Sequence, residues 1–285
     1  MTVVGTAGTG AGRFRRGAGA LAVLLQPRPL ILTGLPYKRD EARREITRRA
    51  RTGSGSELKV TYIATDSRYP LPFGADRGLL AWITTQAFAT GKVRFHAIRE
   101  YFQAFRLDGG GRSYQLFWQR FQRVSNLAIR IEEISGGGRE VRRFFLVPSA
   151  SEPLPPNERP IANLRTNLLT YDRYGFELDP GFWQYLRESR VPTPIDLLRR
   201  FHDQPRSWDF AQLVLYRCFV ARAPSVIPWG ELVEQLGAST THPRRLKAAL
   251  AGVLDTFRSV DPTFAVRFLP GLAGLEVRAW RMPMS

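Results

Sequence analysis

A helical pattern that leads directly into a β-hairpin pattern constrains the fold of this chain more than any other feature. In the segment GGGRSYQLFWQRFQRV, a rotation of about 100° per residue places Tyr114, Phe117, Phe121 and Val124 on one face of a helix. The alternating segment NLAIRIEEI, a glycine-rich tip and the segment VRRFFLV follow, which is the pattern of two paired strands. The sequence therefore predicts a helix with one buried face, followed directly by a hairpin.

Two further helices are predicted ahead of this one. The first is ADRGLLAWITTQAFATG, Ala75–Gly91, and the second is FHAIREYFQAFRL, Phe95–Leu107, with apolar residues at spacings of three and four. The alternating segment ELKVTYIA, Glu57–Ala64, predicts a strand before them. The order helix, helix, turn, helix, hairpin is typical of a winged helix.

The same order returns in the second half of the chain, although the residues do not repeat. The segment Ser207–Arg222 predicts a helix with Phe210, Leu213, Val214 and Phe219 mostly in the core. A short helix over residues 228–237, a longer helix over residues 238–260 and a closing hairpin of FAVRFL and GLEVRAW follow.

We therefore expect an α+β fold with two tandem winged-helix domains, each a helix-turn-helix plus a β-hairpin wing. Residues 1–56 are rich in Gly, Ala, Thr and Arg and are interpreted as a basic, mostly disordered arm, although KRDEARREITRRAR is compatible with a short helix. The first domain is assigned to residues 57–190 and the second to residues 191–285, with RVPTP at the boundary.

The charge of the chain indicates a polyanionic partner. Lys and Arg number 42 against 25 Asp and Glu, which gives a net charge of +17, and nearly all of the excess is arginine. The planar guanidinium of arginine binds two acceptors at once and therefore suits phosphate and guanine. A GC-rich genome explains arginine in place of lysine but leaves the net charge unexplained. We expect nucleic acid as the partner.

The polar face of the first amphipathic helix is the first candidate for DNA contact. A helix fits the major groove, where Arg pairs with guanine and Gln pairs with adenine. Arg and Gln are also good helix formers that any exposed helix can carry. The candidates on this helix are Arg112, Ser113, Gln115, Gln119, Gln122 and Arg123.

The start of the long helix in the second half is the second candidate. The apolar residues Leu246, Leu250, Val253, Leu254 and Phe257 form its buried stripe. Its N-terminus gathers hydroxyls and cations around unpaired backbone N–H groups, which favours a phosphate. The candidates here are Thr240, Thr241, His242, Arg244, Arg245 and Lys247.

Basic residues of the two predicted hairpins complete the set. Phosphate contacts give affinity and register, whereas base contacts give specificity. The residues expected to meet the DNA backbone are Arg139, Arg142 and Arg143 in the first hairpin and Arg267 and Arg278 in the second.

The sequence predicts no catalysis, cofactor or metal. His96, His202 and His242 are isolated, and the glycines of Gly5–Arg13 lack the Gly-Lys-Ser/Thr of a phosphate-binding loop. Cys218 is the single cysteine, which excludes an intramolecular disulfide and thiol-ligated zinc clusters and indicates the cytoplasm. It is expected to pack within an apolar helix.

Three segments resemble plasmid-encoded replication initiators of the RepA type, in the same order along the chain. LPFGADRGLLAWITTQA is similar to their LPYG…RLLLAWI opening, and FELDPGFWQYLRESRVPTPIDLLRRF is similar to their strand, helix and PVPVDL centre. SWDFAQLVLYRCFVAR with IPWGELVEQLG resembles their ALDLYLWLTYR…ISWRALHAQFG stretch. The likeness runs from about Arg48 to Trp280. The LPFGADRG loop is one residue short and lacks the usual Pro-Arg pair, and the first 47 residues have no counterpart.

The resemblance implies tandem winged helices that bind repeated duplex DNA sites, or iterons, at a plasmid origin and recruit the host initiator and replicative helicase. It also implies a possible homodimer, and no membrane is expected among the partners. Two alternatives stay open: a winged-helix transcriptional regulator at a promoter operator, and a winged-helix module that docks proteins.

Overall fold

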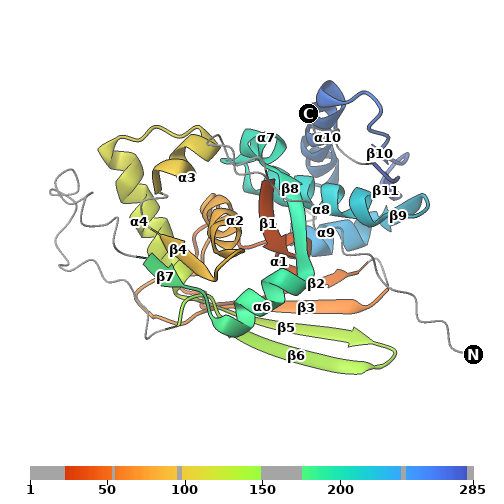
Figure 1. The fold of residues 1–285 in the computed structure, drawn as a ribbon. Coiled ribbons are helices and arrows are strands. Elements are labelled where there is room, and N and C mark those ends of the chain that lie inside the picture. Colours follow the sequence, from red (N-terminus) through yellow and green to blue (C-terminus); the bar gives the residue numbers. More distant parts are fainter. Residues whose placement is uncertain (1–22, 53–54, 95–97, 149–174, 239–241, 281–285) are drawn as a thin grey trace, which may run out of the picture.

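The structure of the protein is a computed structural model that describes residues 23–52, 55–94, 98–148, 175–238 and 242–280. Within these ranges the chain forms a mixed α/β fold with open sheets (Figure 1). No helix of the described residues is long and apolar enough to cross a membrane.

A four-stranded antiparallel sheet forms one side of the first half. It consists of β2 (Glu45–Arg51), β3 (Glu57–Ala64), β5 (Leu127–Ser135) and β6 (Gly138–Phe145), in the order β2-β3-β5-β6. The strand β3 has the bounds that its alternation predicts. Leu58, Val60 and Tyr62 are buried on one face of the sheet, as this alternation requires. The short turn between β5 and β6 consists of glycines, which suits a tight hairpin.

Three helices pack beside this sheet: α2 (Asp76–Ala87), α3 (Ile98–Phe105) and α4 (Gly111–Ser125). The rings of Trp82, Tyr101 and Phe117 meet edge to face between them, with centroids 5.4 to 6.4 Å apart. The buried face predicted for α4 is confirmed. Phe117, Phe121 and Val124 are buried, and Tyr114 packs partly against the same core.

Part of the segment predicted as a disordered arm is ordered. Residues 23–27 form β1 (Val23–Pro27), which pairs antiparallel with β8 (Arg190–Pro194), and α1 (Arg28–Leu32) follows at once. No residue of KRDEARREITRRAR is helical: residues 38–44 form bends and loop, and residues 45–51 form β2 beside β3. Ile46 and Ala50 are buried on the same face of this strand. The charged residues between and beside them hide this apolar pattern in the sequence.

The segment RVPTP, predicted to be a boundary, is the strand β8 itself. It follows β7 (Gly175–Glu177), which pairs with β4 (Lys92–Arg94), and α6 (Pro180–Ser189), whose N-terminus is capped by Asp179. The division into domains at residue 190 stays a prediction.

The second half contains α7 (Ile195–Leu198), the 3-10 turn η3 (Arg199–Phe201), α8 (Pro205–Val220), β9 (Ser225–Pro228), α9 (Trp229–Leu236) and α10 (Pro243–Val260). The strands β10 (Arg267–Phe268) and β11 (Gly274–Val277) close it, in the sheet order β10-β11-β9. The helix α9 ends at Gly237, whose φ of 59° is the left-handed conformation that favours glycine.

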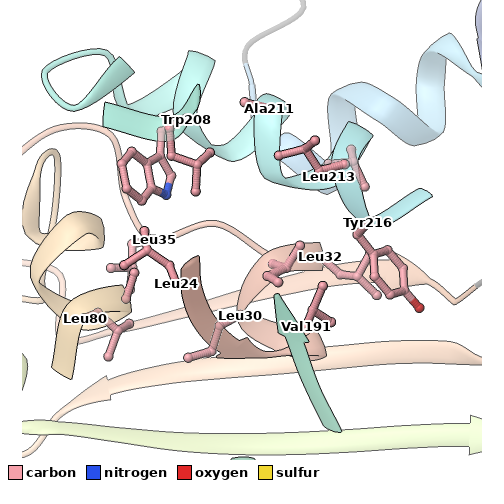
Figure 2. Packing of buried hydrophobic residues seen from close by; sticks show 14 of the residues in the cluster. Leu24, Leu30, Leu32, Leu35, Leu80, Val191, Trp208, Ala211, Leu213 and Tyr216 are labelled. Carbon is pink, nitrogen blue, oxygen red and sulfur yellow. The ribbon is translucent and has the colours of Figure 1, made fainter. Parts of the chain in front are cut away.

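The helix α8 forms the centre of the core. Figure 2 shows Trp208, Leu213 and Tyr216 of α8 facing Leu24 and Leu32 of the N-terminal segment, with Val191 of β8 beside them. Cys218 is buried in this helix, as predicted. Phe219 was expected mostly in the core, but 55% of its surface is exposed, because the last turn of α8 extends beyond its packing partners.

A buried ion pair joins the two halves beneath this core. The guanidinium of Arg77 in α2 donates two hydrogen bonds to the carboxylate of Asp209 in α8, at 2.6 and 2.9 Å. The same guanidinium donates to the carbonyl oxygens of Leu35, Pro36 and Gly74. Only 4% and 7% of the two side chains is exposed, so neither charge has access to water as an alternative partner.

The substitution Asp209→Ala is expected to lower the free energy of unfolding by about 3–5 kcal/mol, because it leaves the charge of Arg77 buried without its counterion. Urea denaturation followed by circular dichroism measures the loss. The control is Asp255→Ala, which breaks an exposed pair with Arg258 and should cost less than about 1 kcal/mol. Equal midpoints for the two variants would contradict the structural role of the buried pair.

Candidate nucleic-acid interface

The polar face predicted on α4 is exposed. Arg112, Gln115, Gln119 and Gln122 are all exposed, and Ser113 is half-buried in the first turn. Arg112 has no ion pair with any residue that the structure describes. These side chains are free to meet the edges of bases, since the opposite face of the helix is fixed in the core.

Arg123, predicted on the same face, is a structural residue instead. Its guanidinium donates hydrogen bonds of 2.7 and 2.9 Å to the carboxylate of Asp76 and lies 4.6 Å from the ring centre of Phe73. Only 14% of its side chain is exposed. Arg120, one turn earlier, lies 3.8 Å from the same carboxylate. The helical rotation that placed Arg123 on the outer face is too coarse to distinguish the edge of that face from the edge of the core.

Asp76 has a structural role that was not predicted from the sequence. Its carboxylate is 1% exposed and holds α4 against the start of α2 through Arg120 and Arg123. It also accepts the backbone N–H of Phe73. Its partners lie 44 and 47 residues away along the chain, so no local pattern in the sequence indicates this role.

The start of α10 presents a second exposed basic surface. His242 stands at its N-cap without a side-chain capping bond, and Arg244 and Arg245 are exposed. Among the described residues, neither arginine has an ion-pair partner. The buried stripe predicted for this helix is confirmed at all five positions. Thr240 and Thr241 lie outside the described residues.

Lys247 has a structural role that differs from the prediction. Its ammonium donates to the carbonyl oxygens of Leu269 and Gly271 and lies 5.7 Å from the ring centre of Phe268. It therefore ties α10 to the loop between β10 and β11 and is not directed at a ligand. A lysine that lies on the flank of a helix can turn either way, and only the neighbouring loop decides its direction.

The arginines of the first hairpin divide between the two faces of the sheet. Arg142 points to the inner face, where it pairs with Glu140 and Glu188 and stacks 5.0 Å from the ring centre of Tyr185. We correct its predicted role from phosphate contact to anchoring α6. Arg139 and Arg143 belong to the opposite, outer face because β-strand side chains alternate.

In the second hairpin, Arg267 and Arg278 both bind the carboxylate of Glu276. Their hydrogen bonds hold the pKa of Glu276 below its ordinary value. The two guanidinium groups remain 62% and 49% exposed, so one carboxylate aligns two exposed cations beside α10. The cluster keeps one net positive charge, which is available to an anion.

His202 is buried under the aromatic cluster. Its ring lies 3.3 Å from the hydroxyl of Tyr101, and burial lowers its pKa, so the neutral form is favoured. His96 lies outside the described residues. The structure shows no group of three or more His, Cys, Asp or Glu that could hold a metal ion, within the part of the chain that it describes.

No protein-family model matches the chain, and no curated protein matches it. Among solved structures, the chain is similar to a crystal structure of domain 2 and domain 3 of RctB, at 12% identity and a TM-score of 0.51. That match covers 89% of this chain and 96% of the other. A second crystal structure, of RctB domains 2-3 (RctB-155-483), is 16% identical with a TM-score of 0.47, covering 80% of this chain and 82% of that one. The mixed α/β architecture is thus shared with RctB domains 2-3.

The substitution Arg123→Ala is expected to lower the free energy of unfolding by about 1.5–3 kcal/mol, because hydrogen bonds to a buried charged group are lost. Chemical denaturation measures this change in the free energy of unfolding. The matched control is Arg112→Ala on the same helix, which should change stability by less than about 0.5 kcal/mol. Arg123 would have to be reassigned to the exposed face if both variants unfolded at the wild-type midpoint.

Proposed function

We propose that the chain is a plasmid replication initiator that binds repeated duplex DNA sites at an origin through two winged helices and recruits host replication proteins. The observation that carries the proposal is that each half presents an exposed helix with arginine that has no ion-pair partner among the described residues, Arg112 on α4 and Arg244 with Arg245 on α10. These helices lie on different sides of the molecule (Figure 1). One chain can thereby meet two segments of a long, directional DNA site.

The strand order of the second half supports a winged helix there. Helix α8, strand β9, helices α9 and α10, and strands β10 and β11 follow in sequence, and β9 pairs with β11. In this arrangement α10 is the recognition helix, and Arg267 and Arg278 lie on the adjacent wing, where they would hold phosphates. In the first half, α2, α3 and α4 precede the hairpin of β5 and β6 in the corresponding order.

The likeness to RctB supports the role in replication. RctB is a replication initiator, and its domains 2 and 3 correspond to nearly the whole described fold of this chain. The proposed DNA contacts are Arg112, Ser113, Gln115, Gln119 and Gln122 on the first recognition helix and Thr240, Thr241, His242, Arg244 and Arg245 at the second.

The chain is proposed to act by binding alone. Opening of the origin then comes from deformation of the DNA and from recruited host proteins, since no nucleotide-binding loop is present in the sequence. The excess of positive charge brings the protein to DNA without sequence preference, and the exposed glutamines and arginines of the two helices select the site.

The double substitution Arg244→Ala with Arg245→Ala is expected to weaken binding to duplex DNA from the region flanking the gene. The loss should be about 1–3 kcal/mol for each base contact removed. Gel-shift titrations of the full chain measure it, and footprinting shows whether the protected segments repeat in direct orientation.

The control for this test is Arg99→Ala with Arg200→Ala, which removes the same charge from two exposed positions that are not part of either recognition helix. Unchanged affinity of the Arg244/Arg245 variant would refute the placement of α10. Protection of a palindrome without support of plasmid replication would instead identify a transcriptional regulator. A protein that only docks other proteins would show no sequence-selective binding.

Binding to duplex DNA is also expected to weaken steeply with salt, with log K falling by about 0.9 per log unit of salt for each phosphate neutralised. A binding series between low and moderate salt gives this slope. The Arg267→Gln with Arg278→Gln variant should show a shallower slope than the wild type because two phosphate contacts are lost. A flat titration of the wild type would contradict the electrostatic basis of the proposal.

A further inference from the structure

The four-stranded sheet has one face that no described helix covers. The helices contact the inner face, where Phe144 lies 5.7 Å from the ring centre of Phe182 and Glu133 pairs with Arg28. The opposite face is formed by alternate residues of each strand, and we call it the outer sheet face. Its members are Glu45, Thr47, Arg49 and Arg51 of β2, Glu57, Lys59, Thr61 and Ile63 of β3, Ala128, Arg130, Glu132 and Ile134 of β5, and Arg139, Val141, Arg143 and Phe145 of β6.

Several of these side chains interact with one another. Thr47 bonds Thr61, and the carboxylate of Glu132 pairs with three surrounding cations of the same face. The hydrogen bond from Arg139, with the nearby charges of Arg130 and Lys59, keeps the pKa of Glu132 below its ordinary value. Six cations stand against three carboxylates, so the outer sheet face keeps an excess of three positive charges.

The register places like charges directly opposite each other at two points. Arg49 faces Lys59 across β2 and β3, and Arg130 faces Arg143 across β5 and β6. Like charges directly opposite on neighbouring strands destabilise a sheet. Arg49 and Arg143 are exposed and have no ion-pair partner among the described residues. The carboxylate of Glu132 offsets the charges of Lys59 and Arg130 in part, and a bound anion would reduce the repulsion that remains at Arg49 and Arg143.

Two exposed apolar side chains flank Arg143 on the outer sheet face. Phe145 is 56% exposed, and it follows Arg143 by two positions on the same strand and therefore on the same face. Val141 on the other side of Arg143 is 42% exposed. An exposed aromatic ring beside guanidinium groups on an open sheet offers stacking to a base and charge to its phosphate together.

We infer that the outer sheet face is a binding site for single-stranded DNA, separate from the two recognition helices. Arg49, Lys59, Arg130 and Arg143 hold the phosphates, and an unpaired base stacks on Phe145. A duplex fits this surface less well, because its bases are stacked inside the helix and present no face to an aromatic ring. The sheet is also a broad surface, whereas the major groove admits a helix or a two-stranded ribbon.

The test is fluorescence anisotropy of the full chain with a labelled oligothymidine of about 20 nucleotides, which has little structure of its own. Phe145→Ser is expected to raise the Kd about fivefold or more, because the stacking of one base is lost. Arg49→Gln with Arg143→Gln should raise it about tenfold and reduce its salt dependence, since two phosphate contacts are removed. Both arginines lack ion-pair partners, so this variant should retain the wild-type unfolding midpoint.

The matched control is Arg99→Gln with Arg200→Gln, which removes the same charge elsewhere and should leave the Kd for oligothymidine within about twofold of the wild type. The inference is overturned if the control loses as much affinity as the outer-face variants, or if those variants bind oligothymidine unchanged. A change in sedimentation of Phe145→Ser without a change in Kd also overturns it, in favour of self-association. Arg244→Ala with Arg245→Ala should weaken duplex binding only, so failure of the proposed origin binding and failure of this site are distinguishable.

Discussion

The ion pair between Arg77 and Asp209 is the interaction on which the arrangement of the two halves depends. Burial raises the pKa of the Asp209 carboxyl and would lower that of the Arg77 guanidinium, but the opposite charge and the hydrogen bonds of Asp209 keep Arg77 firmly protonated. The pair is tolerated because backbone carbonyls satisfy the remaining donors of Arg77. A Cβ at Gly34 would lie 1.9 Å from the Asp209 carboxylate. Position 34 must therefore be glycine for the N-terminal segment to pack this closely against the ion pair.

Two consecutive residues at the start of α2 connect the candidate DNA surfaces. Asp76 binds Arg120 and Arg123 of α4, and Arg77 binds Asp209 of α8, so the first turn of α2 holds both α4 and the second half of the chain. The direction in which α4 presents its glutamines is therefore set by a buried carboxylate and not by the helix itself.

The arginines fall into three groups that differ in burial and in ion-pair partners, and the net charge alone does not separate these groups. Arg77 and Arg123 are buried or nearly so and bind carboxylates within the fold. The arginines around Glu132 and Glu276 share one carboxylate in each cluster, and their side chains are 31% to 62% exposed. Arg112, Arg143, Arg244 and Arg245 are exposed and, among the described residues, have no ion-pair partner. Only the last two groups can neutralise the phosphates of a bound polyanion.

The sequence by itself determined the elements that have a clear apolar period, because that period is a local property: β3, the buried face of α4 and the buried stripe of α10 all follow from it. Its net charge of +17 predicts an anionic partner. Only the tertiary structure decided that residues 23–27 form a strand with residues 190–194, and that Arg123, Arg142 and Lys247 turn to partners within the protein. Such contacts depend on which distant segments lie side by side, and a helical or strand period fixes the face of a residue without fixing its partner.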